Sequence, residues 1–100
     1  PAALKNALDV ASRPYGDNKW AGKTALVASQ SPGAISGFGA NHHLRQILTF
    51  IDVTPVQQPE VYIAYTHELF DEDGGYLKDG TEEFLQSAVD KFVQLVEKSN

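Results

Sequence analysis

The sequence predicts an α/β fold, in which helices cover both sides of a parallel sheet. Two observations support this prediction. Residues 24–28 form a short, unbroken apolar run between polar flanks, which is typical of a strand buried on both faces. Helical and strand-like patterns also alternate along the chain, in the order helix, strand, helix, strand, helix. Such alternation favours parallel strands joined by right-handed crossovers.

The first helix is predicted from apolar residues at helical spacing, namely Leu4, Ala7, Leu8 and Ala11. Pro1 suits a first helical turn, and Arg13-Pro14 ends the helix because proline disfavours the α region for the residue before it. The strand at residues 24–28 is followed by a loop rich in glycine and serine at residues 29–39. A second helix then presents an apolar face formed by Ala40, Leu44, Ile47, Leu48 and Ile51.

A second strand region at residues 53–65 is interrupted by Pro55 and Pro59. Because proline cannot donate a hydrogen bond to a ladder, we expect either an edge strand or a strand entered through a kink. Residues 71–80 form a polar loop, and Asp79 or Thr81 caps the final helix. The apolar stripe of that helix is Leu85, Val89, Phe92 and Val96, joined by Phe84 and Ala88.

Composition excludes several classes of function. One hundred residues suffice for one small domain and not for two. The net charge of -5 and the scattered basic residues argue against a nucleic-acid partner. The absence of cysteine excludes a disulfide scaffold, a cysteine-ligated zinc site and thiol catalysis, and it fits a cytoplasmic protein. No apolar run is long enough to cross a bilayer, so we expect no membrane partner.

The start of the chain and its strand count both predict further residues upstream of Pro1. The chain contains no methionine and begins within a helical pattern. Two strands alone would leave a long apolar sheet edge exposed, so they need neighbours that this sequence does not contain. We therefore expect residues 1–100 to form a single incomplete domain.

The segment Ser29 to Ala40 is the candidate for chemistry. It follows the predicted buried strand and precedes a helix, and open α/β sheets bind ligands outside the carboxyl ends of their strands. Small residues let a flat ring approach the backbone, and free N–H groups suit the electron-rich pyrimidine edge of a flavin. A plain tight connection would have the same local pattern. The segment has neither the lysine of a phosphate-binding P-loop nor the glycines of a hydrolase nucleophile elbow.

Several segments in one order together resemble the NAD(P)H-dependent FMN reductase family, which includes quinone-, chromate- and azo-reducing members. The segments are Pro1–Asp9, Ser12-Arg13-Pro14, Trp20–Lys23, Ser31-Pro32-Gly33 with Gly37, His43–Gln46 and Pro59–Ile63. The resemblance continues through residues 70–74 and the closing helix. Its implied fold is flavodoxin-like, with five parallel strands and FMN at their carboxyl ends. This chain would then be the C-terminal part of a doubly wound parallel sheet, with the first three strands absent.

The resemblance also implies a function and a set of site residues. The cofactors would be FMN and NAD(P)H, and hydride would pass through the flavin to a small acceptor such as a quinone, a flavin or an azo compound. The protein would form a homodimer or a homotetramer. The cofactor-binding residues would be Ser31, Pro32, Gly33, Ala34 and Gly37, with no catalytic side chain and no metal.

Other positions follow from the same resemblance. Residues 1–6 would begin a helix just after a second flavin-contacting loop, and Arg45 and Glu60 would match subunit-contact positions of some members. Many members carry an arginine where this chain has Gly39, which removes any contact that depends on that arginine.

Alternatives remain open. The chain could be a non-catalytic fragment, or a half-domain that pairs with a partner and binds no FMN alone, and we expect it to be inactive by itself. His42-His43 could bind a metal, but adjacent helical side chains point about 100° apart, so surface or interface histidines are favoured. The acidic run Asp71 to Glu82 lacks the glycine spacing of a calcium-binding loop. Trp20, Tyr62 and Tyr65 could stack on a ligand, although core packing is the commoner role of strand aromatics.

Overall fold

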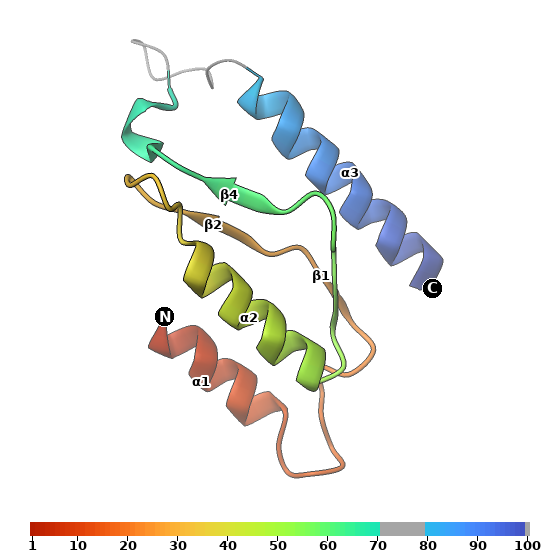
Figure 1. The fold of residues 1–100 in the computed structure, drawn as a ribbon. Helices are drawn as coiled ribbons and strands as arrows, with labels where there is room; N and C mark the ends of the chain where they lie inside the picture. The colour runs from red at the N-terminus through yellow and green to blue at the C-terminus, as the bar shows by residue number, and fades with distance from the viewer. Residues whose placement is uncertain (71–79, 100) are drawn as a thin grey trace.

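The structure is a computed structural model that describes residues 1–70 and 80–99. Its element order agrees with the predicted alternation of helices and strands (Figure 1). The elements are α1 (Ala2–Ala11), β1 (Thr24–Ala25), β2 (Ala28–Gln30), α2 (Phe38–Phe50), β3 (Thr54–Pro55), β4 (Val61–Ile63), the 3-10 helix η1 (Thr66–Glu68) and α3 (Thr81–Ser99).

All described strand pairs are parallel. β1 pairs with β3, so that Thr24 lies opposite Thr54, and β2 pairs with β4, so that Ala28 lies opposite Val61. Between these two pairs the first strand advances from residue 24 to 28, whereas the second advances from residue 54 to 61. The second strand therefore contains three additional residues at its centre. The second strand region is thus interrupted between Pro55 and β4, as the two prolines predict.

The predicted unbroken strand at residues 24–28 is wrong in its bounds. Pairing stops after Ala25, resumes at Ala28 and continues through Ser29 and Gln30, which the sequence assigned to the loop. The additional residues of the second strand explain the gap, because they remove the partners that Leu26 and Val27 would have had. The second helix also begins earlier than predicted, at Phe38.

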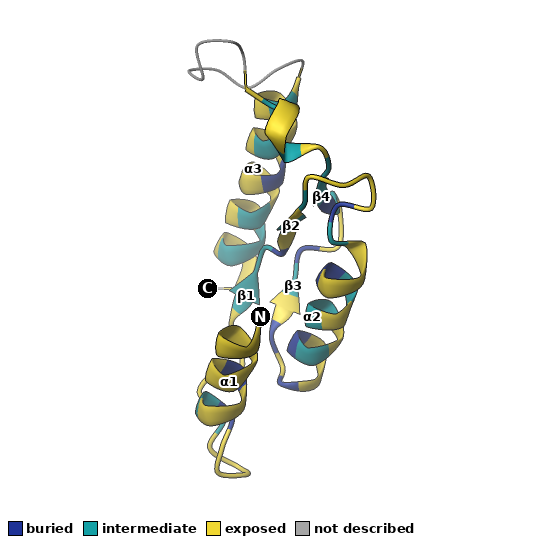
Figure 2. Ribbon diagram, turned by 90° about the vertical axis from the view of Figure 1, so that its left-hand side faces the viewer, coloured by how far each residue is buried: buried dark blue, intermediate teal, exposed yellow. Residues whose placement is uncertain are grey.

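Helices cover both sides of the strands, as the sequence predicts. In Figure 1, α3 lies on one side of the strands and α2 lies on the other, with α1 beside α2. The core joins α1, the strands and α2 through Leu8, Val27, Leu48, Ile51 and Val53. Trp20 packs against this cluster, which supports a structural role for its ring. Figure 2 shows buried residues on the strands and on α2, whereas α1 is mostly exposed.

The buried face of α3 differs from the predicted stripe. It centres on Ala88, which is 1% exposed, and α3 contacts β1. Val89 is 44% exposed because it lies about 100° further round the helix than Ala88. Phe84 is also exposed, so these two residues of the predicted apolar stripe lie outside the buried face. Thr81 was predicted as one of two possible caps of this helix, but it is the first helical residue and not the residue before the helix. The other possible cap, Asp79, lies outside the described residues, as do residues 71–78 of the predicted polar loop and acidic run.

Within residues 1–70 and 80–99, none of the helices combines the length and the apolar character that a membrane span requires.

Leu48 tests the assignment of the core. Leu48→Ala removes a side chain that is 6% exposed from the centre of the cluster, and we expect it to lower the free energy of unfolding by about 3 kcal/mol. The matched control is Val10→Ala on α1, where the side chain is 66% exposed and the loss should be below about 0.5 kcal/mol. Equal losses in urea denaturation would contradict this core.

Candidate functional site

The loop of residues 31–37 lies between the end of β2 and the start of α2 (Figure 1). Because β2 and β4 are parallel, their carboxyl ends lie at the same edge, and the loop is tied to both strands there. The Ser31 N–H donates to the Ile63 carbonyl at 2.9 Å, and the Thr66 N–H donates to the Ser31 carbonyl at 3.3 Å. Residues 31–37 therefore lie where open α/β sheets bind their ligands.

The predicted cofactor-binding residues differ in how far they are exposed to solvent. Pro32, Gly33 and Ala34 are exposed at its tip, whereas Ser31 and Gly37 are half-buried at its two ends. The tip is organised internally, because the Gly33 N–H donates to Ser31 Oγ at 3.1 Å. Among the described residues, the N–H groups of Ala34 and Ile35 donate to no protein acceptor. The tip therefore offers small side chains and free donors.

A left-handed turn closes the loop. Ser36 has a φ of 56° and Gly37 has a φ of 74°, a region that disfavours side chains. A Cβ atom on Gly37 would lie 3.0 Å from Ser29 Cβ, a contact so tight that Ser29 would have to shift. Glycine is thus favoured at position 37 both by the backbone angle and by the close approach to β2.

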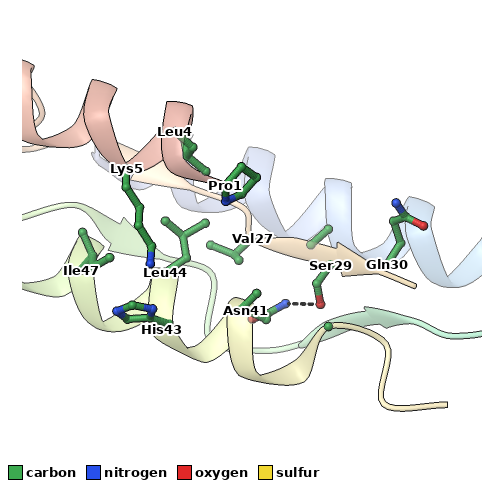
Figure 3. Close-up of a pocket in the computed structure, with 13 residues that line it drawn as sticks. Pro1, Leu4, Lys5, Val27, Ser29, Gln30, Asn41, His43, Leu44 and Ile47 are labelled. Carbon is green, nitrogen blue, oxygen red and sulfur yellow. Dashed lines mark hydrogen bonds between the residues drawn. The ribbon is translucent and has the colours of Figure 1, made fainter. Parts of the chain in front are cut away.

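The half-buried Ser29 and the buried Asn41 hold this turn, and neither was among the five predicted cofactor-binding residues. Ser29 on β2 donates its hydroxyl hydrogen to the Ser36 carbonyl at 2.8 Å. Asn41 on α2 donates from Nδ2 to Ser29 Oγ at 3.2 Å (Figure 3). A signal for Asn41 exists in the sequence, because it precedes Leu44 and Leu48 at helical spacing and so lies on the apolar face of its helix.

A hollow of about 380 Å³ lies beside the turn, between α1, β2 and α2 (Figure 3). Its lining is mostly apolar, with Lys5, Ser29, Asn41 and His43 among the polar side chains. Pro1 lines the same hollow as the end of β2 and Gly37, so the start of α1 lies near this end of the loop. Of the five predicted cofactor-binding residues, Gly37 lines this hollow, whereas residues 31–34 lie outside it.

A second polar cluster lies between α2 and β4. Tyr62 Oη and His42 Nε2 share a hydrogen bond of 2.5 Å, and the two rings are stacked with an interplanar angle of 11°. Phe38 packs on His42 with ring centroids 4.3 Å apart. Partial burial and the neighbouring Glu60 carboxylate raise the pKa of the Tyr62 phenol above its ordinary value, although Arg45 opposes the shift. The phenol is therefore protonated at neutral pH.

The adjacent histidines belong to different surroundings, since His42 contacts Tyr62 whereas His43 lines the hollow. Within the described part of the chain, no group of three potential metal ligands comes together. Tyr62 stacks on His42, and Tyr65 is exposed after β4, where its N–H donates to the Gly33 carbonyl at 3.4 Å.

Arg45 connects α2 to the strand region. Its Nε donates to Asn41 Oδ1 at 2.8 Å, and its Nη1 donates to the Val56 carbonyl at 2.8 Å. Its Nη2 is buried and has no acceptor among the residues that the structure describes. The guanidinium is thus held in place by two hydrogen bonds, while its Nη2 has no acceptor among these residues.

Gly37 tests the geometry of the turn. Gly37→Ala adds both a strained φ and a clash with Ser29, whereas Gly22→Ala adds only the strained φ of 81°, since nothing lies within 4 Å of its Cβ position. We expect Gly37→Ala to lower the free energy of unfolding by about 1–3 kcal/mol more than Gly22→Ala does. Equal effects of the two variants in thermal unfolding would contradict the close approach.

Comparisons with known proteins agree with this architecture. The NADPH-dependent FMN reductase family matches residues 1–68. A quinone reductase from Pseudomonas putida is 56% identical over 96 residues, which cover 96% of this chain and 51% of that protein. A 2-hydroxy-1,4-benzoquinone reductase from Burkholderia sp is 38% identical over 96 residues, covering 96% of this chain and 52% of that protein. The chain thus spans about half the length of the curated relatives it matches.

A solved structure is also similar. The flavoenzyme NAD(P)H:(acceptor) oxidoreductase from Paracoccus denitrificans superposes with a TM-score of 0.87 at 40% identity, covering 99% of this chain and 54% of that one. This likeness and the parallel strands confirm the flavodoxin-like α/β fold class predicted from the sequence. Together with the family match over residues 1–68, it confirms the resemblance drawn from the sequence segments. The chain belongs to the NADPH-dependent FMN reductase family.

Proposed function

We propose that this chain serves a flavin-dependent NAD(P)H oxidoreductase, in which FMN binds at the loop of residues 31–37 and hydride passes to a small acceptor. The observation that carries the proposal is the position of this loop at the shared carboxyl edge of β2 and β4. Ligands of open α/β sheets bind at that edge. The family to which the chain belongs is named for the same cofactor.

The residues at the loop tip fit a flavin. Pro32, Gly33 and Ala34 are exposed and carry no long side chain that would keep a flat ring from the backbone. The N–H groups of Ala34 and Ile35 are free of protein acceptors in the described part of the chain, so they can donate to ring carbonyl oxygens. Ser31, Pro32, Gly33, Ala34 and Gly37 therefore stay our proposed cofactor-binding residues.

Bound FMN would supply the hydride chemistry, accepting from NAD(P)H and donating to the acceptor. The contribution of the chain is to bind and orient. The loop tip presents backbone N–H donors and no acidic or basic side chain. The chain would therefore accelerate hydride transfer by positioning the reactants. The left-handed turn at Ser36 and Gly37 and its bond to Ser29 keep those donors in one arrangement.

Quinones are the acceptors that we propose first, because several relatives are named for quinone reduction. A quinone is flat and uncharged, so the scarcity of clustered basic residues is no obstacle to its binding. A cytoplasmic location belongs to the same proposal, since a chain without cysteine has no need of an oxidising compartment.

The flavin proposal is tested on the protein as its source cell makes it. We expect visible flavin absorbance, loss of that absorbance when NADPH is added without oxygen, and its return when benzoquinone is added. Gly33→Ala should weaken FMN binding about tenfold, because its methyl group would meet the ring, while the fold has room for it at 3.6 Å from Ser31 Oγ.

The matched control is Gly39→Ala on α2, which has nothing within 4 Å of its Cβ position and should leave FMN affinity unchanged. A colourless protein that gains no flavin on titration would contradict the proposal. That result would favour the alternative, a non-catalytic half-domain that pairs with a partner.

We also propose that the protein is a homodimer or a homotetramer. One observation supports association through α2: the Phe50 side chain is 84% exposed there. Arg45 and Glu60 stay the predicted subunit contacts.

Sedimentation velocity tests the association. We expect a mass of two or four chains, and we expect Phe50→Ser to lower it to that of one chain. Val93→Ser, which changes an exposed apolar residue of α3, should leave the mass unchanged. A wild-type protein that sediments as a monomer at micromolar concentration is incompatible with this proposal.

A further inference from the structure

One buried amide links the strands to the loop. The Asn41 side chain belongs to the first turn of α2 and is 1% exposed. Its Nδ2 donates to Ser29 Oγ at 3.2 Å and to the Val61 carbonyl at 3.1 Å, and its Oδ1 accepts from Arg45 Nε at 2.8 Å. Both amide hydrogens and the oxygen are thus used. A buried amide with complete hydrogen bonding has one favoured orientation, because every alternative leaves a polar group unsatisfied.

Ser29 connects the Asn41 amide to the loop. A serine hydroxyl has one hydrogen, and that of Ser29 is donated to the Ser36 carbonyl at 2.8 Å. The same oxygen accepts the bond from Asn41 (Figure 3). The Ser29 hydroxyl is therefore held by Asn41 on one side and bonded to Ser36 on the other. Ser36 is the first residue of the left-handed turn that ends the loop, and it is buried. The conformation of the turn therefore depends on a hydroxyl that Asn41 orients.

The network has a fixed far end. Arg45 Nη1 donates to the Val56 carbonyl at 2.8 Å, just beyond β3, while its Nε holds the Asn41 oxygen. A continuous chain of hydrogen bonds thus runs from Val56 through Arg45, Asn41 and Ser29 to Ser36. Charge-assisted bonds from a guanidinium are stronger than neutral ones, so the Arg45 end is the firmer anchor.

We propose that Asn41 is a positioning residue for the flavin-binding loop, and that it acts on residues 31–37 through Ser29. This inference rests on the proposed FMN-binding function. Asn41 sets the direction of the Ser29 hydroxyl, the hydroxyl holds the Ser36 carbonyl, and the turn at Ser36 and Gly37 fixes the free N–H groups before it. Loss of either side chain frees the loop end without removing any atom of the loop itself.

The experiment is a double-mutant cycle that measures FMN affinity. Ser29→Ala, Asn41→Ala and the double variant are each made in the whole protein to which residues 1–100 belong. We expect each single variant to weaken FMN binding about tenfold and the double variant to be no weaker than the worse single variant. The two effects are not additive because both variants break the same path. Thr49→Ala, which removes a hydroxyl bonded to the Arg45 carbonyl on the exposed side of α2, should leave FMN affinity unchanged.

Thermal unfolding of the flavin-free protein separates positioning from stability. Asn41→Ala removes the bond to the Val61 carbonyl and leaves the Arg45 Nε without its acceptor, so it should lower the melting temperature, whereas Ser29→Ala should lower it much less. Ser29→Ala therefore carries the test even if Asn41→Ala fails to fold. Unchanged FMN affinity in Ser29→Ala, or additive losses in the double variant, would overturn the positioning role alone. A wild-type protein that takes up no FMN would overturn both this inference and the proposed function.

Discussion

The contact between Gly37 and Ser29 is the constraint on which the rest of the site depends. It brings the start of α2 against the end of β2, at a distance that leaves little room for any side chain at position 37. The backbone reaches this position through two consecutive left-handed residues, Ser36 and Gly37, which compress the connection between strand and helix. The loop tip is thereby pushed outward with small side chains exposed, and the first turn of α2 is brought close enough for Asn41 to reach β2. A longer or straighter connection would leave both the loop and the amide network without support.

The parallel pairing of the strands gives this contact its place in the fold. The additional residues of the second strand shift the register between β1·β3 and β2·β4, yet the carboxyl ends of β2 and β4 still coincide. The segment after β4 consequently bonds to Ser31 and Gly33 and closes the other end of the loop. The loop is held by the strand edge at one end and by Ser29 at the other, which is the kind of rigid backbone that catalysis by positioning requires.

The sequence was sufficient for the element order, the parallel arrangement and the position of the loop, because these follow from local periodicity and from general rules of α/β connection. It was not sufficient where non-local contacts decide. The bounds of the first strand depend on which residues of the second strand lie opposite Leu26 and Val27. The exposure of Val89 depends on the side of α3 that meets β1, where Ala88 permits the closest approach. Asn41 interrupts an otherwise apolar face, and only the fold reveals that Ser29, Val61 and Arg45 meet there to satisfy it.

A crystal structure of the protein with FMN bound tests the central claim most directly. Our account predicts the isoalloxazine ring against residues 32–34, with its carbonyl oxygens about 3 Å from backbone N–H groups of the loop and with Ser29 still bonded to Ser36. A flavin ring bound elsewhere on the protein, or a loop whose turn at Ser36 and Gly37 has opened, would contradict it.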